Sequence, residues 1–150
     1  MFNKTWKKIL FGGFLLLLIG AGIYWYIATD TFSDTKGRKA EFSVKADDFL
    51  KEYQTDSKQA NLKYTEKIVE VSGIVSATEA ADSSINIKIA DTTSGSYVIF
   101  AFQDKDMDEA RSVKAGDLVT IKGSCSGGVY SSILETWAIT FKRSTLSNKP

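Results

Sequence analysis

The sequence predicts a mainly β protein: a five-stranded barrel preceded by one or two short helices, with an N-terminal transmembrane helix. Three observations support this fold class. An uncharged apolar run covers residues 9–28. Apolar residues then recur at helical spacing between residues 44 and 64, and from residue 67 onward they alternate with polar residues at the period of a strand. A chain of 150 residues leaves room for one small domain after the apolar run.

The apolar run is long enough for a helix to cross the hydrocarbon core of a bilayer, which takes about twenty residues. Three lysines precede it, and the first charges after it, Asp30 and Asp34, are acidic. The positive-inside rule therefore places residues 1–8 in the cytoplasm, makes residues 9–28 a single-pass anchor and exports the rest. A cleaved signal peptide is the alternative, but its apolar core is shorter, about 7–15 residues, and ends in small residues. This run ends in two tyrosines and a tryptophan at residues 24–26.

Composition narrows the classes of function. The chain has no His and a single Cys, Cys125. It therefore lacks the commonest general base and the usual zinc and haem ligand. Three of the 19 basic residues precede the apolar run, which leaves 16 against all 18 acidic residues in the exported part. We expect no enzyme, no metal and no cofactor, and no general affinity for a phosphate backbone.

Polar and charged residues 29–43 are interpreted as a tether between the anchor and the domain. Ser43 can cap a helix that begins at the next residue, and a break at residues 54–58 separates this helix from a second, shorter one. The apolar residues at helical spacing are Ala46, Phe49, Leu50 and Tyr53 in the first helix, and Ala60 and Tyr64 in the second. Both helices should pack one apolar face against the sheet that follows.

Five segments show the alternation of a strand. They cover residues 67–77, 85–89, 97–103, 118–125 and 133–141. Gly73, in the middle of the first strand, predicts a bulge or a sharp bend. Residues 104–111 are predicted to form a short helix or turn, residues 126–128 to open a loop, and residues 143–150 to form a polar tail.

Five strands with a short helix between the third and fourth have the order of an OB-fold, a small, partly open Greek-key barrel. Residues 44–142 are therefore predicted to form an OB-fold-like Greek-key barrel with N-terminal helices. A generic five- or six-stranded barrel or sandwich is the alternative. The position of the inter-strand helix, and the glycines in strands that must bend, favour the OB-fold.

A longer residue pattern runs through residues 44–141. It consists of Phe49-Leu50, Tyr53, Ala60, Tyr64 and Lys67, then Val71-x-Gly73-x-Val75, then Ala115-Gly116-Asp117-x-Val119-x-Ile121-x-Gly123-x-Cys125-x-Gly127. This pattern resembles the tRNA-anticodon-like OB-fold family of small exported or membrane-anchored bacterial proteins. The resemblance implies an OB-fold at the bacterial cytoplasmic membrane, with the C-terminal domain on its periplasmic or extracellular side. It implies nucleic-acid binding by analogy of fold alone, and no catalytic residue.

Two further features of the sequence resemble sites of chemistry. Asp104, Asp106 and Asp108 have the spacing that opens a calcium loop, but the glycine and the glutamate that such a loop needs are missing. We interpret them as the acidic start of a short helix. Cys125 lies on the inward side of its strand and is expected to be buried as a small hydrophobic residue.

The outward sides of the second and third strands supply most of the candidate binding residues. In OB-folds this face and its flanking loops bind oligonucleotides or saccharides. The candidates are Asn86, Lys88, Tyr97, Ile99 and Gln103, with Lys122 on the fourth strand and Tyr130 in the loop after it. A tyrosine for stacking and a lysine for phosphate are the least that a single strand needs. An ordinary solvated sheet face is the alternative interpretation.

We therefore expect a membrane-anchored, exported OB-fold binding or adaptor module that is not catalytic and whose partner is another protein. The alternative is a binder of single-stranded nucleic acid or of an oligosaccharide through the OB face. The slightly acidic charge of the exported part places the protein partner first.

Overall fold

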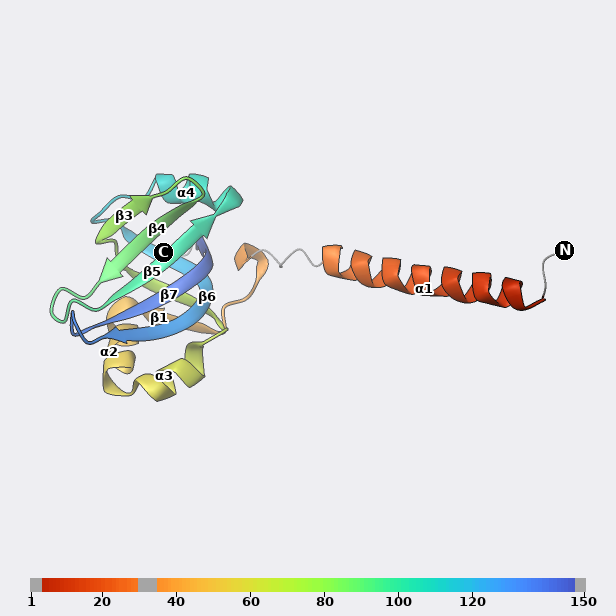
Figure 1. Cartoon of the computed structure of the whole chain (residues 1–150). Coiled ribbons are helices and arrows are strands. Elements are labelled where there is room, and N and C mark those ends of the chain that lie inside the picture. Colours follow the sequence, from red (N-terminus) through yellow and green to blue (C-terminus); the bar gives the residue numbers. More distant parts are fainter. Residues whose placement is uncertain (1–3, 30–34, 148–150) are drawn as a thin grey trace. The chain divides into compact units, whose positions relative to one another are not determined.

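The computed structural model describes residues 4–29 and 35–147. The chain divides into two units, Met1–Asp34 and Thr35–Pro150, and each is described by itself (Figure 1). The described part of the first unit is one helix. The second unit holds all the strands and the other helices that the structure describes.

Helix α1 (Lys4–Thr29) has 26 residues. Its large apolar side chains are exposed along the helix. By length and composition the helix could cross a membrane, and a signal sequence near the N-terminus passes the same test. The predicted long apolar helix over residues 9–28 is therefore confirmed, and its role as an anchor stays a prediction.

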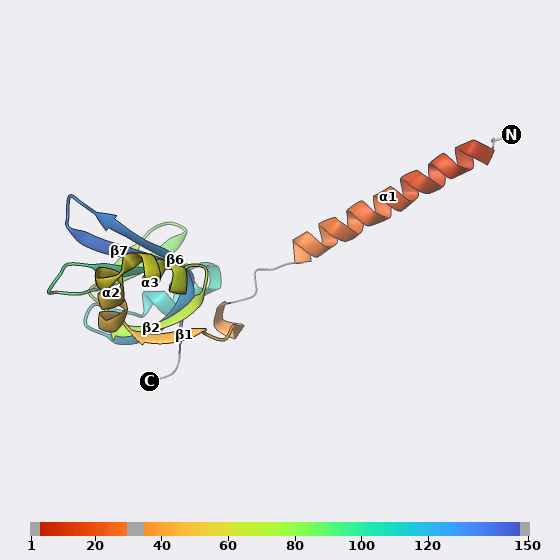
Figure 2. The ribbon, with the colours of Figure 1, turned by 90° about the horizontal axis from the view of Figure 1, so that it is seen from below.

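The second unit is a β domain with short helices (Figures 1 and 2). Its helical elements are η1 (Thr35–Gly37), α2 (Ala46–Thr55), α3 (Ser57–Tyr64), η2 (Asp104–Asp106) and α4 (Met107–Arg111). Its strands are β1 (Phe42–Lys45), β2 (Ile68–Ile74), β3 (Ala77–Ala80), β4 (Ser84–Ala90), β5 (Tyr97–Gln103), β6 (Leu118–Ser131) and β7 (Thr136–Leu146). They form one sheet in the order β1-β2-β6-β7-β5-β4-β3.

The domain is OB-fold-like. Strand β5 pairs with β7 in parallel, whereas β2 with β6, β6 with β7 and β4 with β5 pair antiparallel. The short helix expected between the third and fourth main strands is present as η2 and α4. Strands β2 and β3 are separated only by Val75 and Ser76, whose backbone N–H groups donate to the carbonyls of Asp117 and Lys88 at 2.9 and 2.8 Å. The sheet thus has seven strands rather than the predicted five, because β1 and β3 were not foreseen.

The core joins helices α2 and α3 to the inner side of the sheet. Helix α2 packs on β1, β2, β5 and β7, and α3 packs on β6. The ring centroids of Phe49 and Tyr64 lie 4.9 Å apart, and those of Phe100 and Phe141 lie 4.8 Å apart, all four side chains being fully buried. Aromatic side chains remove large apolar areas from water, so this cluster supplies much of the stabilisation. The predicted packing of both helices on the sheet is confirmed.

The domain begins earlier than predicted. Strand β1 lies within the segment interpreted as tether, and it pairs in parallel with β2. Ser43 therefore belongs to a strand and caps no helix, and α2 begins after Lys45 without a side-chain cap. The ring of Phe42 packs edge-on against that of Tyr64, with the ring centroids 5.1 Å apart. This apolar contact stabilises the segment as a strand of the sheet.

The last two strands are longer than predicted. Strand β6 runs through residues 126–128, which were expected to form a loop, and β7 continues through residues 143–146, which were expected to belong to the tail. Ile133, predicted to open the fifth strand, lies in the turn before it. A Cβ on Gly128 would lie 2.6 Å from the Tyr53 ring, so this glycine lets β6 pass close to α2.

The bulges lie in β6 and not at Gly73. The pairing of β6 with β7 shifts between Lys122 and Ser124 and again between Cys125 and Gly127. Ser124 is buried beside the inward Cys125, although strict alternation would turn it outward. The pairing of β2 with β6 runs without a shift through Gly73, whose missing Cβ would come within 2.9 Å of the Ala46 side chain. The bulge predicted at Gly73 is wrong, and close approach of α2 explains this glycine.

Candidate ligand-binding face

The outward side of β4 and β5 is a regular two-strand surface. Residues alternate without interruption between buried and partly exposed along both strands, apart from exposed Gln103 at the end of β5. The inward residues are Ile85, Ile87, Ile89, Val98, Phe100 and Phe102. Residues that lie opposite each other on paired strands share a face, so this alternation places Asn86, Lys88, Tyr97 and Ile99 outward together. The expected outward placement of these candidates holds in the structure.

Lys88 and Tyr97 are two candidates whose side chains are in contact. Lys88 lies opposite Ile99 on β5, and its ammonium group sits over the Tyr97 ring at 4.1 Å from the centroid. This cation–π contact holds both side chains against the sheet. It also covers one side of the ring, so a base could stack on Tyr97 only on its other side or by displacing the lysine. Gln103 lies at the far end of β5, opposite Ser84.

Three further strands extend this face. Across β3, Ala77 lies opposite Lys88 and Glu79 lies opposite Asn86. Across β7 and β6, Tyr97 is followed by Ala138 and then Val129 in one row. We define the OB face as the outward residues of β3, β4 and β5. Its charged side chains are Lys88 and Glu79, of opposite sign.

Lys122 does not join the OB face. It lies on β6 opposite Glu70, and its ammonium group donates to the backbone carbonyls of Lys36 and Arg38 at 3.0 and 2.8 Å. The side chain therefore ties the start of the domain to β6, which is a structural role. The structure therefore separates Lys122 from the candidates Lys88 and Tyr97.

Tyr130 points to the other side of the sheet. It is a strand residue of β6 and lies opposite Trp137 on β7, with ring centroids 5.3 Å apart. Trp137 in turn approaches Tyr53 of α2 at 6.1 Å. Val129, the neighbour of Tyr130, shares the row of Tyr97, so Tyr130 faces away from the OB face. The structure thus separates Tyr130 from the other candidates.

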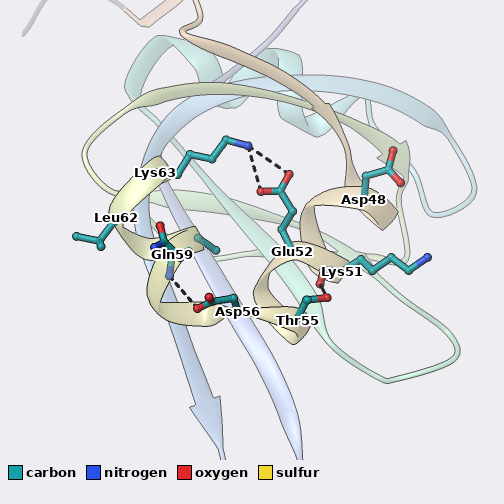
Figure 3. Close-up of a pocket in the computed structure, with 9 residues that line it drawn as sticks. Asp48, Lys51, Glu52, Thr55, Asp56, Gln59, Leu62 and Lys63 are labelled. Atoms are coloured by element: carbon teal, nitrogen blue, oxygen red, sulfur yellow. Dashed lines mark hydrogen bonds and ion pairs between the residues drawn. The ribbon is translucent and has the colours of Figure 1, made fainter.

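A hollow of about 760 Å³ lies between α2 and α3 (Figure 3). Two contacts join polar groups of this hollow: Lys63 pairs with Glu52 at 3.2 Å, and Asp56 accepts the backbone N–H of Gln59 at 3.1 Å. The Tyr64 phenol and the Glu52 carboxylate raise the pKa of Lys63, which keeps this amine protonated. No His or Cys lines the hollow, and its Lys63 is ion-paired with Glu52. The sequence did not predict it, because it depends on how two helices meet.

The other candidates for chemistry are structural. Cys125 is fully buried, with its sulfur 3.9 Å from the Tyr53 hydroxyl, and burial raises the pKa of both groups. Its predicted burial is confirmed. Within residues 4–29 and 35–147, no group of three or more His, Cys, Asp or Glu residues could hold a metal ion. Asp108 and Glu109 lie in the first turn of α4, where the helix dipole favours acidic residues.

The sequence pattern missed the exposed apolar residues at the end of the β6–β7 hairpin. Ile133 and Leu134 lie in the turn, and Ile133 is 91% exposed. In the sequence they resembled the start of a strand. The two serines before them and the positive φ of Glu135 after them belong to a turn, and the serines were the only signal visible in the sequence.

Comparisons with known proteins agree with this fold. The model of the tRNA_anti-like family matches residues 1–134. No curated protein matches the chain in sequence. A lipoprotein of Klebsiella pneumoniae subsp. pneumoniae MGH 78578, named as a candidate nucleic acid-binding protein, is 18% identical, with a TM-score of 0.55 over 70% of this chain and 91% of that one. OBody AM3L09, solved bound to hen egg-white lysozyme, is 17% identical, with a TM-score of 0.43 over 59% of this chain and 88% of that one. At 18% identity the likeness to the Klebsiella protein concerns the fold alone.

Proposed function

The chain belongs to the tRNA_anti-like family, and on this premise we propose that it is a membrane-anchored, exported adaptor that binds another protein and catalyses no reaction. The family match indicates a binding domain and no catalytic class. Two described residues support the absence of catalysis, since the one cysteine is buried and Lys63 of the hollow is ion-paired.

The anchor in this proposal is α1 itself. Lysines precede its apolar run and acidic residues follow it, the charge pattern of a helix that keeps its N-terminus in the cytoplasm. The Klebsiella protein of similar fold is named a lipoprotein, which supports a place at a membrane. This chain has no cysteine near α1 that could carry a lipid, because its one cysteine is Cys125 in β6.

The low charge of the OB face is the observation that carries the choice of a protein partner. One lysine and one glutamate share a surface otherwise made of uncharged side chains, among them Tyr97 and Ile99. Protein interfaces are depleted of charged residues at their centre and enriched in tyrosine. A phosphate backbone requires several lysines and arginines instead. The OB face thus favours a protein over a nucleic acid.

Single-stranded nucleic acid is the second candidate ligand. The name of the Klebsiella protein and the contact between Lys88 and Tyr97 favour it. Stacking of a base on a tyrosine is worth about 1–3 kcal/mol, and binding to phosphates weakens with salt. An oligosaccharide would use the same aromatic ring without the salt dependence.

Titration of the full chain in nanodiscs with a labelled single-stranded oligonucleotide separates these ligands. We expect no saturable binding at moderate salt. Saturable, salt-sensitive binding would refute the adaptor proposal and support nucleic-acid binding if Tyr97→Ala abolishes it and Tyr130→Ala leaves it unchanged. The matched variant Tyr130→Ala removes the same side chain from the opposite side of the sheet.

The protein partner itself is tested by photocrosslinking in native membranes. A benzoylphenylalanine at Ile99, on the OB face, should form a discrete adduct with another protein. The same probe at Leu62, an exposed apolar residue of α3 away from the face, should not. Equal labelling at both positions, or none at Ile99, would contradict binding through the OB face.

A further inference from the structure

The end of the β6–β7 hairpin exposes four apolar side chains within six residues. Ile133 is 91%, Val129 72%, Leu134 67% and Tyr130 49% exposed. We call Val129, Ile133 and Leu134 the apolar tip, since Tyr130 points to the other side of the sheet. Single exposed apolar residues are ordinary on protein surfaces, but a contiguous group marks an interaction site.

The apolar tip is held in a regular hairpin. Val129 lies opposite Ala138, Tyr130 opposite Trp137 and Ser131 opposite Thr136. The Ser131 hydroxyl accepts the backbone N–H of Leu134 at 3.3 Å, inside the turn. Ring contact between Tyr130 and Trp137 stiffens the two strands where they leave the core. A partner would therefore meet a preformed, convex surface, with little conformational entropy left to lose.

The apolar tip continues the OB face. Tyr97, Ala138 and Val129 form one row across β5, β7 and β6, so the surface runs from the face onto the hairpin without a charged side chain. In both views the end of this hairpin lies at the side of the domain remote from η1, where the described chain enters it (Figures 1 and 2).

The charges of the hairpin restrict what can cover it. Residues 126–141 contain no lysine or arginine and a single acidic residue, Glu135, in the turn itself. Phosphate groups of a nucleic acid or of anionic lipids would find no cation there. An acidic residue beside Leu134 also opposes insertion of the turn into a bilayer. A second copy of this chain offers the hollow between α2 and α3, but charged side chains line it (Figure 3).

We propose that the apolar tip inserts into an apolar groove of an exported protein, and that a basic side chain at the rim of this groove meets Glu135. The proposal rests on the adaptor function and names the surface through which the partner is held. Ile133 and Leu134 fill the groove, and Val129 carries the contact onto the OB face. Apolar anchors that become fully desolvated at the centre of an interface contribute most of the binding energy.

The experiment uses the full chain in native membranes, with benzoylphenylalanine at Ile133 and, in separate samples, at Ile99 and Leu62. We expect the protein adduct at Ile133 to be the same as that at Ile99, and none at Leu62. In the chain with the probe at Ile133, Leu134→Asp should lower the adduct yield by about tenfold or more, as loss of an interface anchor does. Glu135→Lys should lower it as well, and Glu135→Gln should lower it less. An unchanged yield in the Leu134→Asp or Glu135→Lys chain refutes this mode of docking.

The remaining outcomes identify other occupants. An adduct with lipid at Ile133 would show that the apolar tip inserts into the bilayer and would refute the protein groove. An adduct of doubled chain mass would show that the apolar tip binds a second copy of this chain. A protein adduct at Ile99 without one at Ile133 would refute docking through the apolar tip and would agree with the proposed adaptor function. Absence of protein adducts at Ile99 and Ile133 would refute both the docking proposal and the adaptor function. Equal unfolding midpoints of the variant chains would show that the domain remains folded.

Discussion

The β4–β5 ribbon and the β6–β7 ribbon contribute to the same core in different ways. Strands β4 and β5 have seven residues each, pair without a shift and alternate strictly between buried and exposed. Strands β6 and β7 have 14 and 11 residues, contain two register shifts and extend beyond the core. The first ribbon is a simple two-sided sheet, and the second is bent around the helices.

The difference shows how a strand can change what it buries along its length. Near Lys122 and Cys125 the shifts turn successive residues of β6 inward, so that Ser124 and Cys125 are both buried. Further along, Gly127 adopts a φ of +99° and Gly128 lets the strand pass the Tyr53 ring. Past that point the apolar side chains of Val129, Tyr130, Ile133 and Leu134 reach solvent.

The largest expected effect is the loss of a ring that joins the two ribbons. Phe100 on β5 and Phe141 on β7 are fully buried, and their rings lie 4.8 Å apart. Phe141→Ala and Phe100→Ala should each lower the free energy of unfolding by about 3–5 kcal/mol. Because the rings touch, the double variant should lose less than the sum. Denaturant unfolding of the four chains measures the coupling, and strict additivity would mean that the ribbons have separate cores.

A smaller loss is expected where β6 passes α2. Gly128→Ala places a Cβ 2.6 Å from the Tyr53 ring and should lower the free energy of unfolding by about 1–3 kcal/mol. Gly37→Ala is the matched control, since its Cβ would meet nothing within 4 Å. Thermal unfolding of both variants tests this. Equal midpoints would show that Tyr53 can move aside and that Gly128 is not required for the bend.

The ribbons should also differ at alkaline pH. The β6–β7 ribbon buries Cys125 against Tyr53, whereas the inward residues of β4–β5 do not titrate. Burial raises the pKa of both groups, so they stay protonated in the folded chain after the unfolded chain has lost its protons. The contribution of these groups to the free energy of unfolding is then fully present below about pH 9, the pKa of the thiol in the unfolded chain. It falls as the pH rises from there to the pKa of the folded chain.

The slope of this fall is about 1.4 kcal/mol per pH unit for each group that remains protonated. Denaturant unfolding between pH 7 and 10.5 measures it. Cys125→Ala should remove the part of the fall that begins near pH 9 and leave the part due to Tyr53. A wild-type chain whose stability does not change up to pH 10 would contradict the burial of the thiol.

The smallest effect is expected at the apolar tip. Ile133→Ser removes an apolar side chain that is 91% exposed and should change the free energy of unfolding by less than about 0.5 kcal/mol. The β6–β7 ribbon would then combine one of the most sensitive positions of the domain, Phe141, with one of the least sensitive. A large loss in the Ile133→Ser chain would show that the turn packs on the domain.

The sequence by itself determined the features that depend on neighbouring residues. An uncharged run specifies α1, and helical spacing specifies α2 and α3, because each reflects the geometry of a single element. Strict alternation placed residues 97–103 in the third strand and located its inward face, as well as that of β4. The order of these elements was enough to predict an OB-fold-like domain.

Only the tertiary structure decided what depends on contacts between distant residues. Lys122 has the sequence context of an exposed strand lysine, but its ammonium group is held by the carbonyl of Lys36, 86 residues away. The course of β6 past residue 126 depends on the Tyr53 ring, and the direction of Tyr130 on pairing with Trp137. Periodicity records which way a side chain points along a regular backbone, and a bulge or a remote contact changes that direction without altering the local pattern.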